Sequence, residues 1–371
     1  TRLTDIQQNF IGDIKLMGMR HRLLLGLDAY QSDIINASTG WVGNGIVSLV
    51  AGTDSGVLTQ VGVDSLLVSS NEGVSTATSQ VLSAYVGDVV NLTDYLIASA
   101  TVRLDRFSGL TNYWSVDQVE SQVAVSPKFG LVYQPLKERL ALFANYMNGF
   151  LNQAPAQVAD SNGTNVRMQI LEPEQANQTE LGIKTELWNK RLALTAAVYQ
   201  ILVSNKVMTD PTNVNGLIQG GEVLSKGLEF SVVANPLKGL NLIAGYSLNQ
   251  SEVVKDDPAN GYLGLRPEEA GPRQLVNYWM SYSAVEGKLK GLTFGLGGNA
   301  ASEHLTLNRS NTGTFTLPSY HILNASIAYK AERYTLTLRA DNLFDAKYYS
   351  GWSTVTPQQR RAIALGFTYR F

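Results

Sequence analysis

The chain has 371 residues, enough for one large domain or several ordinary ones, and its 29 basic and 31 acidic residues nearly cancel. This balance provides no basic field for nucleic acid and no acidic run typical of a disordered tail. Cysteine is absent, which excludes thiolate metal sites, thiol nucleophiles and disulfides, and only 16% of the residues are charged.

Apolar and polar residues alternate along the whole chain, and this pattern predicts strands. Alternate side chains of a strand point to opposite faces, so each segment has one apolar face and one face of small, hydroxyl or charged residues. No apolar run approaches the roughly 18 residues of a membrane helix. The predicted strands are 5–16, 19–30, 79–90, 95–108, 123–134, 139–149, 177–187, 191–205, 222–234, 240–252, 273–284, 291–303, 320–329, 334–343 and 360–371.

The connections between these strands alternate between short turns and long loops. A soluble sandwich would show the same residue alternation, but not this alternation of connection lengths. Short turns on one side and long loops on the other are typical of an outer-membrane barrel, with the short turns in the periplasm. The first long connection, near residues 31–78, contains IVSLVAG (46–52) and DSLLVSS (64–70). Two interpretations stay open for these segments: an extracellular hairpin, or a lid packed on its neighbours. The pattern therefore predicts an all-β, transmembrane, antiparallel up-and-down β-barrel.

The number of predicted strands indicates whether they can form a whole barrel. The number of predicted strands, fifteen, is odd. If the C-terminus lies in the periplasm, the first strand must therefore run from the extracellular side to the periplasmic side. An open sheet cannot lie in lipid because its edge amides would be unpaired. We therefore expect strands to be absent at the N-terminal side and the chain to be part of a larger barrel.

Several segments resemble the C-terminal barrel portion of a TonB-dependent outer-membrane siderophore receptor. They are LEPEQANQTELGIKTEL (171–187), SKGLEFSVVANPLKGLNLIAGYSL (225–248), LPSYHILNASIAY (317–329), DNLFDAKYYS (341–350) and the aromatic terminus Phe371, which serves as the C-terminal barrel signature. The resemblance implies a plugged barrel of about 22 strands in the bacterial outer membrane. Residues 1–371 would then be one partial barrel domain, with about 15 of the 22 strands and without the plug and the first strands.

The same resemblance implies a function and a set of partners. The expected function is uptake of ferric siderophores by TonB-coupled active transport, with the siderophore as cargo and no cofactor. The expected partners are the ferric siderophore, the TonB energy-transducing complex (through the absent plug), outer-membrane lipid and the barrel assembly machinery, but no nucleic acid. Two alternatives stay open: a passive diffusion pore, and a TonB-dependent receptor for a non-siderophore cargo.

Aromatic residues in the long loops are the candidate ligand contacts, because a chelate is recognised by aromatic and hydrogen-bonding surface. These residues are Trp41, Tyr113, Trp114, Tyr262 and Trp352. An interfacial or loop-packing role is the alternative for each of them. The three histidines, His21, His304 and His321, are too scattered to form a Ser–His–acid set or a metal site. We therefore predict that the protein is not an enzyme and has no catalytic or metal-ligating residues.

Overall fold

The structure is a computed structural model that describes residues 1–39, 42–44, 59–68, 70, 73–108, 121–153, 156–158, 167–210, 217–309, 313–352 and 354–371. The chain forms two compact units. The first comprises Thr1–Asn9, Gly26–Ala84 and Leu104–Ala124, and the second comprises Phe10–Leu25, Tyr85–Arg103 and Val125–Phe371. No helix in the described ranges is long and apolar enough to cross a membrane.

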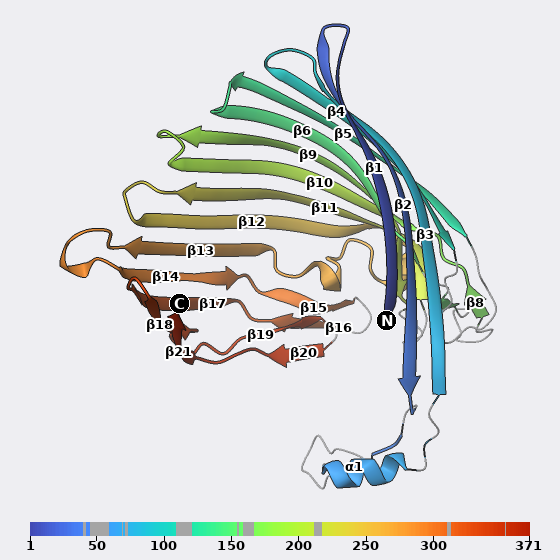
Figure 1. The fold of residues 1–371 in the computed structure, drawn as a ribbon. Helices are drawn as coiled ribbons and strands as arrows, with labels where there is room; N and C mark the ends of the chain where they lie inside the picture. The colour runs from blue at the N-terminus through green and yellow to red at the C-terminus, as the bar shows by residue number, and fades with distance from the viewer. Residues whose placement is uncertain are drawn as a thin grey trace. The chain divides into compact units, whose positions relative to one another are not determined.

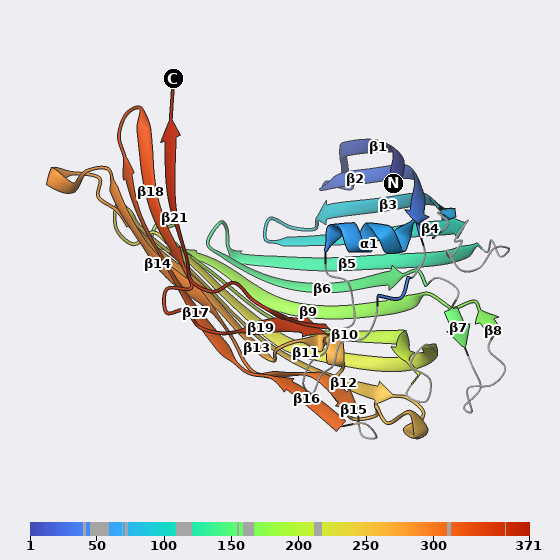
Figure 2. The same ribbon diagram turned by 90° about the horizontal axis from the view of Figure 1, so that it is seen from below.

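A fifteen-stranded sheet dominates the fold, and its strands are neighbours in chain order. Every strand pairing whose register is described is antiparallel, and strands β9 to β14 of the second unit lie side by side in Figures 1 and 2. All fifteen predicted strands are confirmed. Their bounds are β1 Arg2–Leu16, β2 Met19–Ser38, β3 Gly73–Asn91, β4 Leu96–Ser108, β5 Gln122–Leu136, β6 Leu140–Leu151, β9 Glu174–Leu187, β10 Leu192–Thr209, β11 Leu217–Ala234, β12 Leu240–Lys255, β13 Gln274–Ser283, β14 Leu292–Ala301, β17 Tyr320–Lys330, β18 Tyr334–Asp341 and β21 Ala362–Tyr369.

The long connections carry secondary structure of their own. Their described parts contain three hairpins: β7 Ala156–Val158 with β8 Arg167–Gln169, β15 His304–Arg309 with β16 Gly313–Leu317, and β19 Tyr349–Trp352 with β20 Thr354–Pro357. The connection between β12 and β13 contains two 3-10 turns, η1 Pro258–Asn260 and η2 Glu268–Ala270, and η3 Gly287–Leu289 lies between β13 and β14.

The hairpin interpretation of the first long connection is wrong for its second half. Residues 64–67 lie in a helix, α1 Gln60–Leu67, and residues 46–52 fall outside the described residues. The helix begins at Thr59, whose hydroxyl accepts from the Gly62 backbone N–H, and Gln60 donates to Asp64 one turn later at 2.7 Å. These local polar contacts favour a helix over the strand suggested by the apolar residues.

The same connection is shorter than residues 31–78, because β2 and β3 continue beyond the apolar pattern. Polar cross-strand pairs extend them: Thr78 donates to Asp33 at 2.9 Å and Gln80 donates to Gln31 at 3.0 Å. Such pairs support a ladder without an apolar face, so a pattern based on hydrophobic alternation stops too early.

The apolar faces of the strands are exposed, as a lipid-facing surface requires. In the last pairing, Leu336 opposes Phe367 and Leu338 opposes Leu365. Leu365 is 73% exposed although it is in the middle of a paired strand. Beyond β21 the Phe371 ring lies 5.2 Å from that of Tyr369, near the turn that joins β17 to β18.

The DNLFDAKYY segment forms a turn after β18 that side-chain hydrogen bonds stabilise. Asn342 is only 3% exposed, and its side chain donates to the carbonyls of Ala346 and Gln359 and accepts from the Ala346 N–H. Asp345 accepts three hydrogen bonds: from the Arg360 Nε at 2.8 Å, from the Arg360 Nη2, and from the Arg361 N–H at 2.9 Å. The side chains of Asn342 and Asp345 therefore join the start of this long connection to its end.

The pKa of Asp345 is expected to lie well below its ordinary value of 3.8, because Arg360 and then the Arg361 N–H bond the carboxylate. A lowered pKa means that this contribution to stability is present above the ordinary value and is lost only as pH falls through the lowered one. In ¹³C NMR of the folded protein, the Asp345 carboxyl should show no titration between pH 5 and about pH 3. In R360Q its midpoint should rise toward the ordinary value. A wild-type midpoint near 3.8 would contradict this assignment.

Candidate functional site

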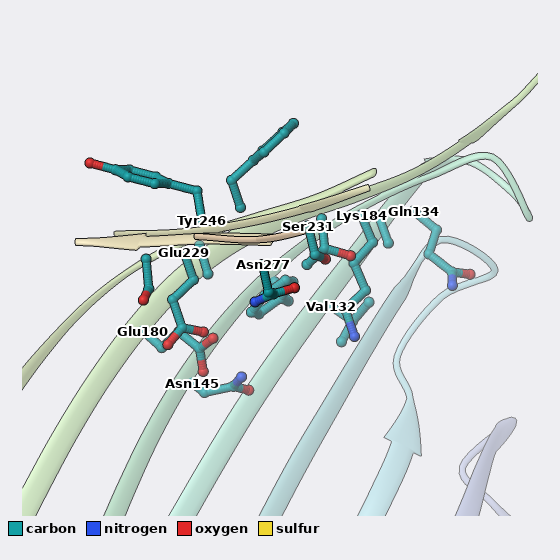
Figure 3. A pocket seen from close by; sticks show the side chains of 15 residues that line it. Val132, Gln134, Asn145, Glu180, Lys184, Glu229, Ser231, Tyr246 and Asn277 are labelled. Atoms are coloured by element: carbon teal, nitrogen blue, oxygen red, sulfur yellow. The ribbon is translucent and has the colours of Figure 1, made fainter. Parts of the chain in front are cut away.

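The polar face of the central strands contains a hollow of about 750 Å³, here called the wall pocket. Its polar lining comes from seven strands: Gln134 of β5, Asn145 of β6, Glu180 and Lys184 of β9, Thr195 of β10, Glu229 and Ser231 of β11, Ser247 of β12 and Asn277 of β13. Figure 3 shows Glu180, Glu229 and Asn145 gathered on one side of the sheet, with Tyr246 on the opposite side. Glu180 and Lys184 therefore both lie on the polar face of β9.

Glycines in register with large side chains create the hollow. Gly182 pairs with Phe143, whose ring covers the space that a Cβ at Gly182 would occupy. Gly245 pairs with Asn277 in the same way, and a Cβ there would be 2.9 Å from the Asn277 Oδ1. Because the large side chains lie flat across the neighbouring strand, the polar face remains open above them.

Charges of both signs line the wall pocket. Lys184 Nζ lies 5.5 Å from the centre of the Phe143 ring, a distance that suits a cation–π contact. Glu180 of β9 lies opposite Asn145 of β6 in the register, and Glu229 of β11 lies opposite Ala197 of the adjacent strand β10. The hollow therefore offers acceptors, amides and one stacked cation to a polar surface or ligand placed against it.

A second cluster, here called the loop platform, lies at the long-loop end of β10 to β12. Tyr262 is 8% exposed and packs with Val223 and Val253, and partly buried Val203 and Met208 complete this small apolar core. Burial raises the pKa of the Tyr262 hydroxyl. A cavity of about 360 Å³ adjoins the core.

Arg266 anchors the connection between β12 and β13 onto the sheet. It is 9% exposed, and its guanidinium donates to the Asn249 carbonyl and Oδ1, both at 3.1 Å, and to the Ala270 and Gly271 carbonyls at 3.2 and 3.0 Å. Its bonding partners are all neutral, so burial, followed by the nearby charge of Arg273, lowers the pKa of Arg266. The Asn249 side chain in turn donates to the Tyr199 hydroxyl at 3.1 Å, which links this loop to the polar face of β10.

Ion pairs tie neighbouring loops to the same platform. Arg309 of β15 bonds Glu268 at 2.9 Å, and Asn308 donates to the Arg266 carbonyl at 2.8 Å. Lys206 of β10 lies between Glu269 at 3.3 Å and Glu174 at 3.8 Å. The loop platform therefore fixes two long connections, β12–β13 and β14–β17, with respect to each other and to the ends of β9 and β10, as a preorganised recognition surface requires.

The structure describes only one of the five predicted ligand contacts fully. Tyr262 lines the cavity of the loop platform, where its packing in the apolar core is also evident. Trp41, Tyr113 and Trp114 lie outside the described residues. The backbone of Trp352 is in β19, but its side chain is outside the described part.

The histidines have separate neighbours. His21 Nδ1 is 2.7 Å from Asp88 Oδ2, whereas His321 Nε2 is 2.7 Å from the Tyr278 hydroxyl and its ring stacks on that tyrosine. Burial lowers the pKa of His304 in β15. Among the described residues, no three His, Asp or Glu side chains form a group that could hold a metal ion.

Comparison with known proteins identifies a β-barrel family. Residues 1–343 match the family model of the TonB dependent receptor-like β-barrel. The chain belongs to this family. It is therefore a transmembrane barrel chain of the bacterial outer membrane, and the family consists of receptors and transporters rather than enzymes.

Curated relatives resemble part of the chain. The ferrichrome outer membrane transporter/phage receptor of Escherichia coli K12 is 26% identical over 211 residues, which are 54% of this chain and 27% of that protein. The metal-pseudopaline receptor CntO of Pseudomonas aeruginosa PAO1 is 28% identical over 68% of this chain and 34% of the relative. The ferrioxamine B receptor of Salmonella typhimurium SL1344 is 30% identical over 62% of this chain and 32% of its own length. Each match thus spans about a third or less of the relative.

Solved structures share the fold over nearly the whole chain. The ferripyoverdine receptor of Pseudomonas aeruginosa has a TM-score of 0.78 at 18% identity, with 99% of this chain and 48% of that one covered. The ferric-catecholate import receptor Fiu of Escherichia coli K12 has a TM-score of 0.74 at 21% identity, with 100% of this chain and 54% of that one covered. This chain therefore matches about half of either receptor.

Sequence reasoning missed most of the wall pocket and the anchor of the loop platform. Phe143, Asn145, Glu229 and Asn277 are ordinary alternating residues until the register places them together. Arg266 lies in a loop that its sequence marks only by Gly and Pro. Glycine at an otherwise regular strand position, as at Gly182, is the one signal that could have indicated a close neighbour.

Proposed function

We propose that the complete receptor carrying this chain takes up ferric siderophores by TonB-coupled active transport. The observation that carries the proposal is membership of the TonB-dependent receptor family, together with relatives whose names specify ferrichrome and ferrioxamine B. A chelate brings its own metal ligands, so the protein needs aromatic and hydrogen-bonding surface. The loop platform and the wall pocket offer surfaces of this kind.

The ligand contacts are proposed in the long loops, at Trp41, Tyr113, Trp114, Tyr262 and Trp352. Tyr262 supports this location because it borders a cavity next to charged Lys206 and Glu269. Through Arg266, the same loop is bonded to the polar face of the sheet. A chelate that contacts these loops would then be linked, through Arg266, to the polar face of the sheet.

Uptake of ⁵⁵Fe-labelled siderophores tests the proposal. Cells lacking the complete gene should take up one class of ferric siderophore (hydroxamate, catecholate or mixed) much less well than cells that express it. Uptake should disappear when the proton-motive force is collapsed, because coupling draws on the inner membrane. Equal uptake with and without the gene for every class would reject the siderophore cargo, and uptake that survives the collapse would reject the coupling.

Two alternative functions, uptake of a different cargo and passive diffusion, can be tested as well. The receptor CntO is named for metal-pseudopaline without mention of iron, which favours a non-siderophore or non-iron metal chelate as the second candidate. Competition of ⁵⁵Fe uptake by chelates of nickel, cobalt and zinc separates the two cargos. Swelling of proteoliposomes in small sugars would instead indicate a passive pore.

Replacing Trp41 or Trp114 by Ala is expected to weaken binding of the transported chelate about tenfold or more for each, because a buried aromatic contact contributes roughly 2 kcal/mol. Tryptophan fluorescence quenching by the ferric chelate measures the dissociation constant. The matched control is W188A, since Trp188 is an exposed tryptophan in the turn between β9 and β10. Unchanged affinity in both loop variants would remove these residues from the site.

A further inference from the structure

Basic residues gather at the short-turn end of the strands. The rim is defined here as residues 13–22, 91–96, 135–140, 186–192, 234–240, 284–292, 329–335 and 369–371, which are the seven short turns with their flanks and the end of the chain. It holds thirteen of the 29 basic residues but only six of the 31 acidic ones. The remainder of the chain therefore carries 16 basic and 25 acidic residues, the opposite balance. All eight segments belong to the second unit.

Ion pairs neutralise only a minority of the rim cations. Lys137 lies 3.6 Å from Asp94, Lys190 lies 3.2 Å from Glu138, and Lys238 lies 2.8 Å from Glu286, each pair joining two turns. Arg20 pairs with Asp13 across a single turn. The other nine form no ion pair within the described part of the chain: Lys15, Arg22, Arg139, Arg191, Lys288, Lys290, Lys330, Arg333 and Arg370.

Exposed apolar side chains lie beside these cations in most of the turns. Trp188, 65% exposed, precedes Lys190 and Arg191, and Lys137 Nζ lies 5.1 Å from the Tyr95 ring centre. The other exposed apolar residues of the rim include Met17, Leu136, Leu237, Leu289, Tyr334 and Phe371. In Figure 1 the turns between β9 and β10, β11 and β12, and β13 and β14 project at the same end of their strands.

An uncompensated cation next to an exposed apolar or aromatic side chain suits a membrane interface. The apolar part enters the acyl boundary while the ammonium or guanidinium reaches the phosphate layer. We propose that the rim binds the headgroups of acidic phospholipids in the inner leaflet of the outer membrane. A protein partner would call for one contiguous patch, whereas this combination repeats in turn after turn along the sheet edge.

Lipid retention by the complete receptor tests this proposal. After exchange into nanodiscs of phosphatidylglycerol and phosphatidylethanolamine, native mass spectrometry should detect retained phosphatidylglycerol on the wild type. Retention should fall about five-fold for each charge removed in K288Q/K290Q/R333Q, because each basic residue near an anionic surface adds roughly that factor. It should also weaken as salt is raised.

Two further variants make the test decisive. K288R/K290R/R333K keeps the charges and should retain phosphatidylglycerol as the wild type does. K255Q/R273Q/K347Q removes three exposed charges from the long-loop end and should change nothing. Wild-type retention of phosphatidylglycerol by the neutralised rim, equal loss in the long-loop variant, or equal retention of phosphatidylethanolamine by the wild type would overturn the proposal. None of these outcomes depends on siderophore transport.

Discussion

Amide hydrogen exchange across residues 256–273 is expected to accelerate about 100-fold when Arg266 is replaced by Met in the complete receptor. The guanidinium of Arg266 is buried and donates to two carbonyls of its own loop and to both oxygens of Asn249 on β12. Hydrogen bonds to a charged group contribute roughly 1.5–3 kcal/mol, and the freed carbonyls would remain desolvated. A net loss of about 3 kcal/mol corresponds to the expected acceleration.

The effect of Arg266→Met should be local. Amides of β11 and β12 should keep their protection, since the sheet pairing does not use the Arg266 side chain. R273M is the matched control, because Arg273 is exposed in the same connection and bonds β12 through its backbone carbonyl. Exchange at the wild-type rate in R266M, or equal acceleration in R273M, would show that Arg266 does not anchor the loop.

If the loop platform recognises the chelate, the affinity for the chelate should also depend on Arg266. R266M would leave Tyr262 and Glu268 in the chain but release them from a fixed arrangement. Affinity should then fall because the loop must be ordered on binding. Normal affinity combined with fast exchange would move the recognition surface away from this loop.

Gly298→Ala is expected to lower the free energy of unfolding by about 3 kcal/mol. Gly298 of β14 pairs with Leu323 of β17, and an added Cβ would overlap the backbone carbonyl oxygen of Ile322. The Tyr278 hydroxyl on the other neighbouring strand would be 3.2 Å away. A backbone atom cannot rotate aside as a side chain can, so β17 must shift and its pairing must weaken.

Urea unfolding of the folded receptor in detergent measures this loss as a lower midpoint. Gly366→Ala is the matched control: Gly366 is also a strand glycine, and a Cβ there would be 3.9 Å from its nearest neighbour, the Thr337 carbonyl. That variant should be as stable as the wild type or slightly more so, because alanine costs less backbone entropy than glycine. A wild-type midpoint for G298A would disprove the close approach of the two strands.

The fifteen strands were predictable because the relevant signal is local. In 362–369 each side chain alternates between lipid and polar surroundings, so a short window of residues records its own environment. The ends of β2 and β3 were less predictable, since Gln31, Asp33 and Thr78 pair across the ladder without any apolar alternation. The helix α1 was missed for a related reason: its start depends on a cap at Thr59 rather than on periodicity.

By itself, the sequence determined the strand set, the two-faced sheet, the alternation of short and long connections and the concentration of basic residues in the short turns. Each of these properties depends on neighbours along the chain or on simple counts. The tertiary structure decided which polar side chains share the wall pocket and how Arg266 joins Asn249 to Asn308. Those contacts depend on strand register and on loop conformation, and both result from pairing between residues far apart in the chain.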